Sequence, residues 1–179
     1  MSEPTILPAR PDLVFRVGFA GNRTLPEDTQ ALDAALGDVL AVIASRLVET
    51  LRTAAPPRGG SSIARFYSSA PPTLRLVTGL AEGADTHAAH CLKQLAAPAV
   101  RKELAAVLPF DAATYRASRP PDARATFDEQ LAACCYVVEL DGRYVEGDPG
   151  QVPRARAYRA QSEVLLRQID LLVAVHDAR

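Results

Sequence analysis

The chain has 179 residues, a length that fits one domain, since domains usually contain about 100–200 residues. Hydrophobic residues make up 48% of it and charged residues 23%, proportions that exclude disordered, collagen-like and fibrous proteins. Twenty Lys and Arg against 21 Asp and Glu give a formal net charge of -1, so the overall charge does not indicate binding to nucleic acid or to an anionic membrane.

The sequence contains no recognisable targeting or membrane segment. Prolines and acidic residues interrupt its first twelve residues, and no apolar stretch approaches the roughly 18 residues that a membrane helix needs. Its three cysteines, Cys91, Cys134 and Cys135, are odd in number and two are adjacent, which suits neither a disulfide framework nor a metal knuckle. We therefore expect a cytoplasmic protein without a membrane span, a metal ion or a bound cofactor.

Short apolar runs alternate with helical patterns along the whole chain. The runs, which predict buried parallel strands, are residues 13–19, 74–77, 104–108, 136–140 and 171–175. The helical patterns cover residues 24–51, 83–96, 122–135 and 154–168, and surface loops are expected at 54–72 and 141–153. This alternation predicts a single α/β domain over residues 1–179: a doubly wound, Rossmann-like parallel sheet of about five strands with helices on both faces.

The first helix has the clearest predicted start. Thr24 and Glu27 have the spacing of a capping box, and Pro26 fits the first helical turn. An apolar stripe follows at three- and four-residue spacing, made of Leu32, Leu36, Val39, Leu40, Ile43, Leu47 and Leu51. This stripe predicts a helix that covers one face of the sheet.

Ligands of doubly wound sheets bind beyond the carboxyl ends of the strands, so the candidate binding residues follow the strands. Gly79 and Gly83 bracket a strand-to-helix turn whose amides, with the helix dipole, are suited to hold a phosphate. They do not form the GxGxxG fingerprint, and the alternative is that both glycines only allow tight packing of helix on strand. The full candidate set is Gly18, Gly21, Asn22, Arg23, Thr78, Gly79, Leu80, Ala81, Glu82, Gly83, Ala84, Asp85, Pro109, His176 and Asp177.

Three of these segments together resemble a known superfamily. GFAGNR follows the first strand, TGLAEGADTHAAH the second, and VLPF ends the third. The combination resembles the SLOG superfamily of Rossmann-like domains, and its later segments look like the stand-alone sensor branch. That superfamily includes the LOG phosphoribohydrolases, the DNA-processing protein A (Smf) family and nucleotide-sensing domains of bacterial defence systems. The resemblance covers most of the chain and implies a nucleotide or nucleotide-derived ligand at the strand ends.

The resemblance also implies roles for individual residues. The phosphate would lie on the amides around residues 79–84, Arg23 would clamp it, and Glu82 would accept hydrogen bonds from ribose hydroxyls. Asn22 stands where the superfamily usually has His. Because an amide does not titrate near neutral pH, Asn22 argues against an acid–base role at that position.

A LOG-type catalytic loop is missing from the sequence. The LOG enzymes carry a Pro-Gly-Gly-x-Gly-Thr loop with a catalytic Glu after a later strand, whereas the only Gly-Gly pair here is Gly59-Gly60. The sequence given stops four residues past the fifth run. We expect either that it is the N-terminal part of a longer protein or that this second half-site is absent, and both interpretations weaken the case for an enzyme.

Three functions follow as hypotheses. The leading one is a sensor domain that binds a nucleotide-like small molecule and controls a fused or partner effector. The second is a LOG-type hydrolase of N-glycosidic or phosphoribosyl bonds, with Glu82, Asp85 or Asp177 as the available carboxylates. The third is Smf-like binding of DNA, which would need a basic groove that a net charge of -1 does not indicate.

Several other features have a simpler interpretation. His87 and His90 are expected on a solvated helix face, not in a metal site, because no further ligands have suitable spacing. Cys134 and Cys135 are expected to be buried structural thiols, and the basic run Arg154–Arg159 a solvated helix face. An open five-stranded sheet leaves an edge to be covered, which favours a homo-oligomer.

Overall fold

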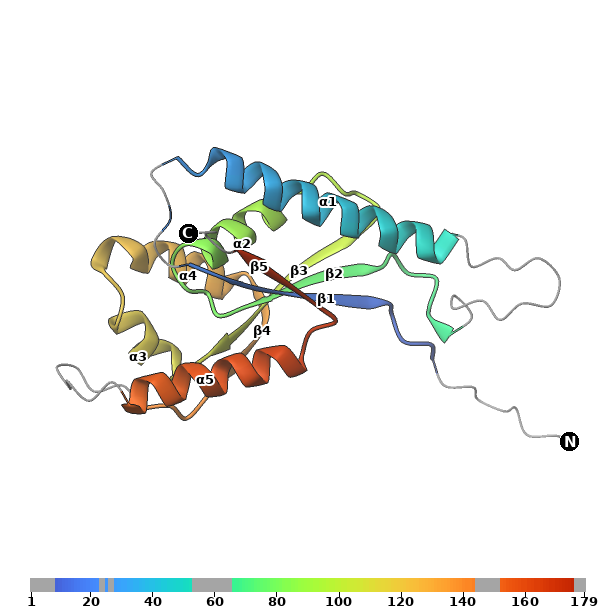
Figure 1. The fold of residues 1–179 in the computed structure, drawn as a ribbon. Coiled ribbons are helices and arrows are strands. Elements are labelled where there is room, and N and C mark those ends of the chain that lie inside the picture. Colours follow the sequence, from blue (N-terminus) through green and yellow to red (C-terminus); the bar gives the residue numbers. More distant parts are fainter. Residues whose placement is uncertain (1–8, 23–24, 26–27, 53–65, 144–151, 176–179) are drawn as a thin grey trace, which may run out of the picture.

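The computed structural model describes residues 9–22, 25, 28–52, 66–143 and 152–175. Its centre is one sheet with the strand order β4-β3-β2-β1-β5, in which all neighbours are parallel (Figure 1). The strands are β1 (Val14–Gly21), β2 (Thr73–Thr78), β3 (Arg101–Leu108), β4 (Cys134–Glu139) and β5 (Leu171–Val175). The predicted α/β, Rossmann-like fold is thereby confirmed.

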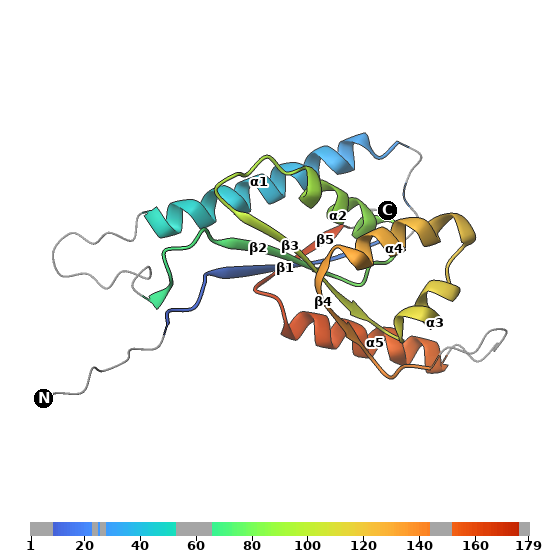
Figure 2. The ribbon, with the colours of Figure 1, turned by 180° about the vertical axis from the view of Figure 1, so that it is seen from behind.

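The helices form a layer on each face of the sheet. They are α1 (Gln30–Arg52), α2 (Ala84–Gln94), α3 (Ala112–Ala117), the 3₁₀ helix η2 (Pro121–Ala123), α4 (Arg124–Ala132) and α5 (Val152–Arg167). From β1 to β4 the chain steps across the sheet in one direction, so right-handed crossovers place α1, α2 and α4 on one face. The step from β4 back to β5 reverses the direction and places α5 on the other face (Figures 1 and 2).

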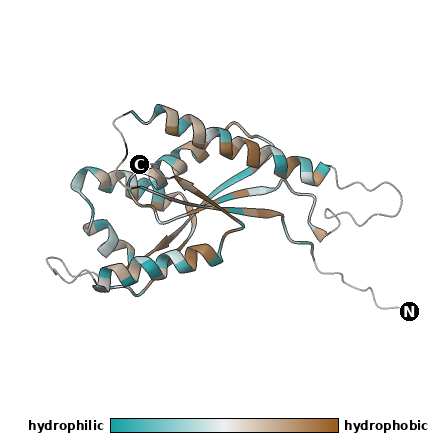
Figure 3. Cartoon of the chain, in the orientation of Figure 1, coloured by the Kyte–Doolittle hydropathy of each residue, from teal (hydrophilic) through white to brown (hydrophobic). Residues whose placement is uncertain are grey.

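Apolar side chains fill the space between the sheet and both helix layers. The larger cluster joins the sheet to α1, α2 and α4, and the fully buried Leu40, Leu74 and Leu76 belong to it. The smaller cluster, with Val77, Val107 and Leu165, lies under α5. Burial of each such side chain stabilises the fold by about 1.5–3 kcal/mol. Strand β5 is hydrophobic along its whole length, whereas β3 begins with three charged residues and becomes apolar towards its carboxyl end (Figure 3).

Helix α1 begins later than the capping box predicted. Its first residue is Gln30, whose amide donates to Oδ1 of Asp28 at 2.9 Å, so an aspartate two residues earlier satisfies this end. Residues 23–24 and 26–27 of the predicted box lie outside the described residues. The predicted stripe is correct for the buried Leu36, Leu40 and Leu47, whereas Val39 is 37% exposed.

The third helix, predicted over residues 122–135, starts as expected with η2 and α4, but its predicted C-terminal end and its thiols are wrong. The first helical turn after β3 starts at Ala112, where the Asp111 carboxylate accepts from the Thr114 amide, and this short helix was not predicted. Helix α4 ends at Ala132, and the two adjacent cysteines begin strand β4 instead of ending the helix. Because β4 is an edge strand, Cys135 is exposed and Cys134 only half-buried, so neither is the buried thiol that was expected.

Candidate functional site

The side chain of Asp85 organises the turn between β2 and α2. Its Oδ2 accepts hydrogen bonds from the Thr78 hydroxyl at 2.6 Å, the Gly79 amide at 3.0 Å and the Ala81 amide at 3.3 Å. The residue is 7% exposed. Two of the amides predicted to hold a phosphate therefore donate to a carboxylate of the chain itself.

The backbone of this turn adopts conformations that most residues avoid. Leu80 has a φ of 51° and is fully buried, and Gly83 has a φ of 82° with a ψ of -129°, a region occupied essentially by glycine. The half-buried part of the turn is Ala81, Glu82 and Gly83. Within the described part of the chain, the amides of Glu82 and Gly83 donate no hydrogen bond to another backbone group, and both residues directly precede α2.

The turn after β1 lies directly against the start of α2. The Asn22 carbonyl accepts a hydrogen bond from the Ala84 amide at 3.2 Å. A Cβ added at Gly21 would stand 2.5 Å from the Cβ of Ala84 and 2.9 Å from that of Val175. The structure thus brings together three predicted site residues, Gly21, Asn22 and Ala84, at the edge where β1 and β5 end.

Packing explains the two remaining strand glycines. A Cβ at Gly18 would stand 2.6 Å from Cδ1 of Ile169, and a Cβ at Gly79 would stand 2.5 Å from Nε2 of Gln161. That amide nitrogen is held by the Val107 carbonyl at 2.7 Å. Close approach of protein atoms is therefore sufficient reason for these glycines, in line with the packing alternative.

Other predicted site residues have different placements. Pro109 follows β3 and is buried, so its side chain is not open to a ligand. Arg23, His176 and Asp177 lie outside the described residues. The phosphate clamp assigned to Arg23 consequently stays a prediction.

A buried arginine that the sequence analysis missed holds the β2–α2 turn from the other side. Arg119 follows α3, is 6% exposed, and donates through Nη2 to the carbonyl of Leu80. Its Nη1 lies 3.6 Å from Oε1 of Glu82. The guanidinium carbon lies 4.6 Å from the ring centres of both Tyr115 and Phe127, close enough for cation–π attraction to each.

The guanidinium of Arg119 is not fully satisfied. Its Nε is buried and has no hydrogen-bond partner, the one such side-chain atom among the described residues. A buried cation with an unpaired donor is costly to a fold, so its presence beside the turn needs a reason. Sequence reasoning could not find it, because a single Arg in a Ser-Arg-Pro-Pro segment carries no periodicity or motif.

A small cavity lies beside Arg119 at the carboxyl edge. Its volume is about 20 Å³, room for roughly one water molecule, which needs about 10–15 Å³. Residues from three elements line it: Ala81, Glu82, Tyr115, Ser118, Arg119, Arg154 and Tyr158. Arg154 belongs to the basic run that was expected to be only solvated, and its guanidinium lies 5.8 Å from the Tyr158 ring centre.

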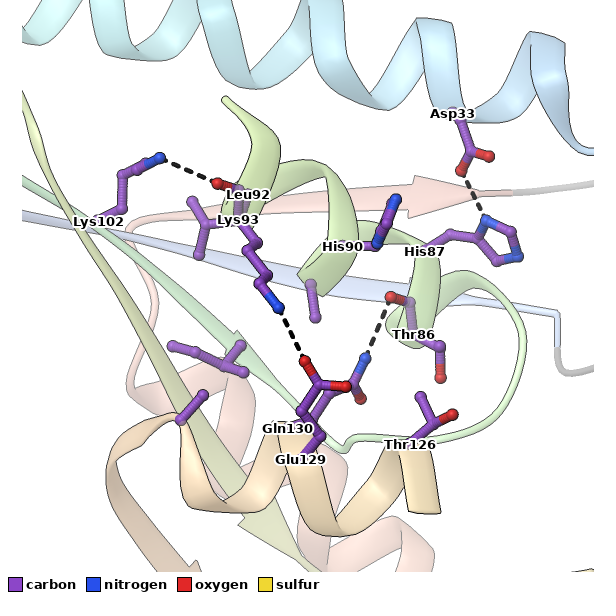
Figure 4. A pocket seen from close by; sticks show the side chains of 13 residues that line it. Asp33, Thr86, His87, His90, Leu92, Lys93, Lys102, Thr126, Glu129 and Gln130 are labelled. Carbon is purple, nitrogen blue, oxygen red and sulfur yellow. Dashed lines mark hydrogen bonds and ion pairs between the residues drawn. The ribbon is translucent and has the colours of Figure 1, made fainter. Parts of the chain in front are cut away.

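A much larger cavity of about 600 Å³ lies between α2 and α4 over Leu104 (Figure 4). An ion pair and a hydrogen bond join its walls: Lys93 lies 2.8 Å from Glu129, and the Gln130 side chain donates to the Thr86 carbonyl at 3.3 Å. It contains none of the predicted ligand-binding residues. Its size is typical of ligand pockets, but two carboxylates and two lysines in its lining balance in charge, so no particular ligand charge is favoured.

His87 was expected on a solvated helix face, but in the structure its side chain is paired with Asp33. Its Nδ1 lies 2.6 Å from Oδ1 of Asp33, so the pair ties α2 to α1 (Figure 4). His90 is exposed, and its Nε2 lies 2.8 Å from the Gln94 amide nitrogen. Among the described residues, no three His, Cys, Asp or Glu side chains are grouped so as to hold a metal ion.

The three cysteines are free thiols with raised pKa values. Burial raises the pKa of Cys134 to about 12 and is also the largest cause of the increase at Cys91 and Cys135. Because the thiolate is the reactive form, these shifts lower the reactivity of all three thiols near neutral pH.

Comparison with known proteins adds no family assignment. No protein-family model matches the chain, and no curated protein sequence matches it. In the described part of the chain, no helix combines the length and the apolar character needed to cross a bilayer. The fold defines the protein as an α/β, Rossmann-like domain.

Proposed function

We propose that this chain binds a nucleotide or nucleotide-derived ligand at the carboxyl edge of its sheet and acts as a sensor domain for a fused or partner effector. The observation that carries the proposal is the half-buried turn at residues 81–83, which opens α2 directly against the buried guanidinium of Arg119. Free amides at a helix start and a fixed cation are both suited to an anionic group. The SLOG-like motifs at this turn support a nucleotide as its source.

The sensor interpretation is favoured over the two alternatives by the side chains at the turn. The carboxylate of Asp85 accepts hydrogen bonds from the turn and that of Glu82 faces Arg119, so both have structural contacts. For DNA binding, the net charge of -1 offers no sign of the basic groove that phosphate contacts require.

The cellular location and the biological role are proposed on two further grounds. Three free thiols support a reducing, cytoplasmic location. The resemblance to the sensor branch supports a role in bacterial defence signalling.

We also propose that the chain forms a homo-oligomer through β5. The two sheet edges differ: β4 has a register shift against β3 and ends at the exposed Glu139, whereas β5 pairs with β1 in regular register and is uncharged. Leu171 and Leu172 are each 41% exposed there, and Leu166 of α5 is 51% exposed. Natural sheets block edges with bulges and charges, and β5 has neither, so a second copy paired along β5 is the favoured occupant.

A thermal-shift screen tests the proposed function. AMP, ADP-ribose, NAD and cyclic dinucleotides are added, and each is recovered and analysed by chromatography. A ligand at about a hundred times its dissociation constant stabilises the fold by about 2.7 kcal/mol, a shift of several degrees at this chain length. A shift with intact ligand supports the sensor, and a shift with consumed ligand favours the hydrolase. No shift with any of them contradicts the proposal.

A further inference from the structure

We infer that the anionic group of the ligand binds between Arg119 and Arg154, and that the Glu82 carboxylate occupies this cation until the ligand displaces it. The inference rests on the proposed function and names where the phosphate of a nucleotide is held. It differs from the sequence-based expectation, in which the phosphate lies on the amides around Gly79 and is clamped by Arg23.

The first step is that the expected phosphate position is already filled. The amides of Gly79 and Ala81 donate to Asp85, which also accepts from Thr78 and is 7% exposed. A phosphate on those amides would have to expel a buried carboxylate that makes these three hydrogen bonds. Hydrogen bonds to ionised groups are among the strongest in proteins, so the anion needs another partner.

The second step is that Arg119 is held in place while some of its N–H donors lack an acceptor. Contacts with the rings of Tyr115 and Phe127, both on one side of it, and the hydrogen bond to the Leu80 carbonyl fix the guanidinium. A guanidinium has five N–H donors, yet Nε has no acceptor and Nη1 has Glu82 only at 3.6 Å, beyond a good hydrogen bond. Because its position is fixed on folding, little side-chain entropy is lost when an anion binds.

The third step is that Glu82 is a displaceable partner. Its side chain is 41% exposed, against 5% for that of Arg119, and it lies in the half-buried part of the turn. The carboxylate is open to solvent and, at 3.6 Å, makes no good hydrogen bond to Arg119, so a ligand oxyanion can take its place. Arg154 lines the same cavity from α5 and places a second guanidinium on its wall, which favours an anion of higher charge than a carboxylate.

Displacement would also move the turn. Glu82 and Leu80 both contact Arg119, and the Thr86 hydroxyl at the start of α2 donates to the Ala81 carbonyl at 3.0 Å. Release of Glu82 therefore loosens the segment that joins β2 to α2. This is a contact that differs between the empty and the occupied site, as a sensor requires.

The test measures binding of inorganic pyrophosphate, adenosine and the nucleotides of the thermal-shift panel by isothermal titration calorimetry. Glu82→Gln removes the competing charge and is expected to bind pyrophosphate and the active nucleotide about two- to fivefold more tightly, the range that corresponds to release of a half-exposed ion pair. Arg154→Gln is expected to bind them several-fold more weakly. Arg156→Gln is the matched control, because Arg156 is exposed on the same helix and does not line the cavity.

Arg119→Lys keeps the charge but loses the planar fork, and is expected to lower the affinity at least about tenfold. Since this substitution alters a buried residue, the conclusion rests on Glu82→Gln and Arg154→Gln, both at less buried positions. Nucleotide affinities that are unchanged in both variants, or adenosine that binds as tightly as AMP, would overturn the inference while the proposed function stands. Failure of the wild type and Glu82→Gln to bind any of these compounds would overturn both.

Discussion

Replacement of Asp85 by Ala is expected to destabilise the fold strongly. The carboxylate accepts three hydrogen bonds, from the Thr78 hydroxyl and from the amides of Gly79 and Ala81, and all of these groups lie in or beside the buried turn. A hydrogen bond to an ionised group contributes about 1.5–3 kcal/mol, and removing one buried partner leaves the donors without an acceptor. The losses are not additive, so we expect a decrease of about 3–5 kcal/mol in the free energy of unfolding.

Urea denaturation and calorimetry measure this change. For a chain of this length each kcal/mol lowers the melting temperature by about 2–4 °C, so the expected decrease is about 6–20 °C. Asp85→Asn keeps one acceptor oxygen and is expected to lose less, about 1–3 kcal/mol. Asp38→Ala, at an exposed position of α1, is the control and should change stability by no more than about 0.5 kcal/mol. A loss below about 1 kcal/mol for Asp85→Ala would refute the assignment of Asp85 as the organiser of the turn.

Three further predictions test other parts of the structure. Gly79→Ala should lower the free energy of unfolding by about 1–3 kcal/mol, because the new Cβ would stand 2.5 Å from the amide nitrogen of Gln161, which is held in place. Gly37→Ala in α1, where a Cβ meets nothing within 4 Å, should instead raise it by about 0.5–1 kcal/mol. Equal effects of the two substitutions in urea denaturation would contradict this. Iodoacetamide at pH 8 should modify the exposed Cys135 before Cys134, whose pKa is raised to about 12, and mass spectrometry that finds the reverse order would disprove their placement. Leu172→Lys should convert the oligomer to a monomer in light-scattering chromatography, while Cys135→Lys on the β4 edge should not; a monomeric wild type would rule out the β5 contact.

The sequence predicts the fold well because its strands and helices repeat a simple pattern. The run at residues 171–175 matches β5 at both ends, and the alternation of runs and helices suffices to define a parallel sheet. Short helices and the exact starts of capped helices are harder to predict from sequence. Helix α3 has six residues and no apolar stripe, and the start of α1 depends on Asp28, which the capping-box pattern did not indicate.

The candidate site is predictable only in its location. Residues 78–85 do form a tight turn at the carboxyl edge, as the glycines and the strand end suggested. The use of its amides by Asp85, and the approach of Arg119 from a segment 39 residues after Leu80, depend on tertiary contacts that no local pattern encodes. Arg119, the cation of the candidate site, could therefore be identified only from the structure.

The most direct test of ligand binding at the carboxyl edge is NMR mapping with the ¹⁵N-labelled protein. The spectrum is recorded while the nucleotide that gives the largest thermal shift is added. The account predicts that the amide signals of residues 81–85 and of Arg119 shift together and saturate, while those of Lys93 and Lys102, which line the cavity between α2 and α4, stay in place. Shifts confined to that larger cavity, or no saturable shift at residues 81–85, would contradict it.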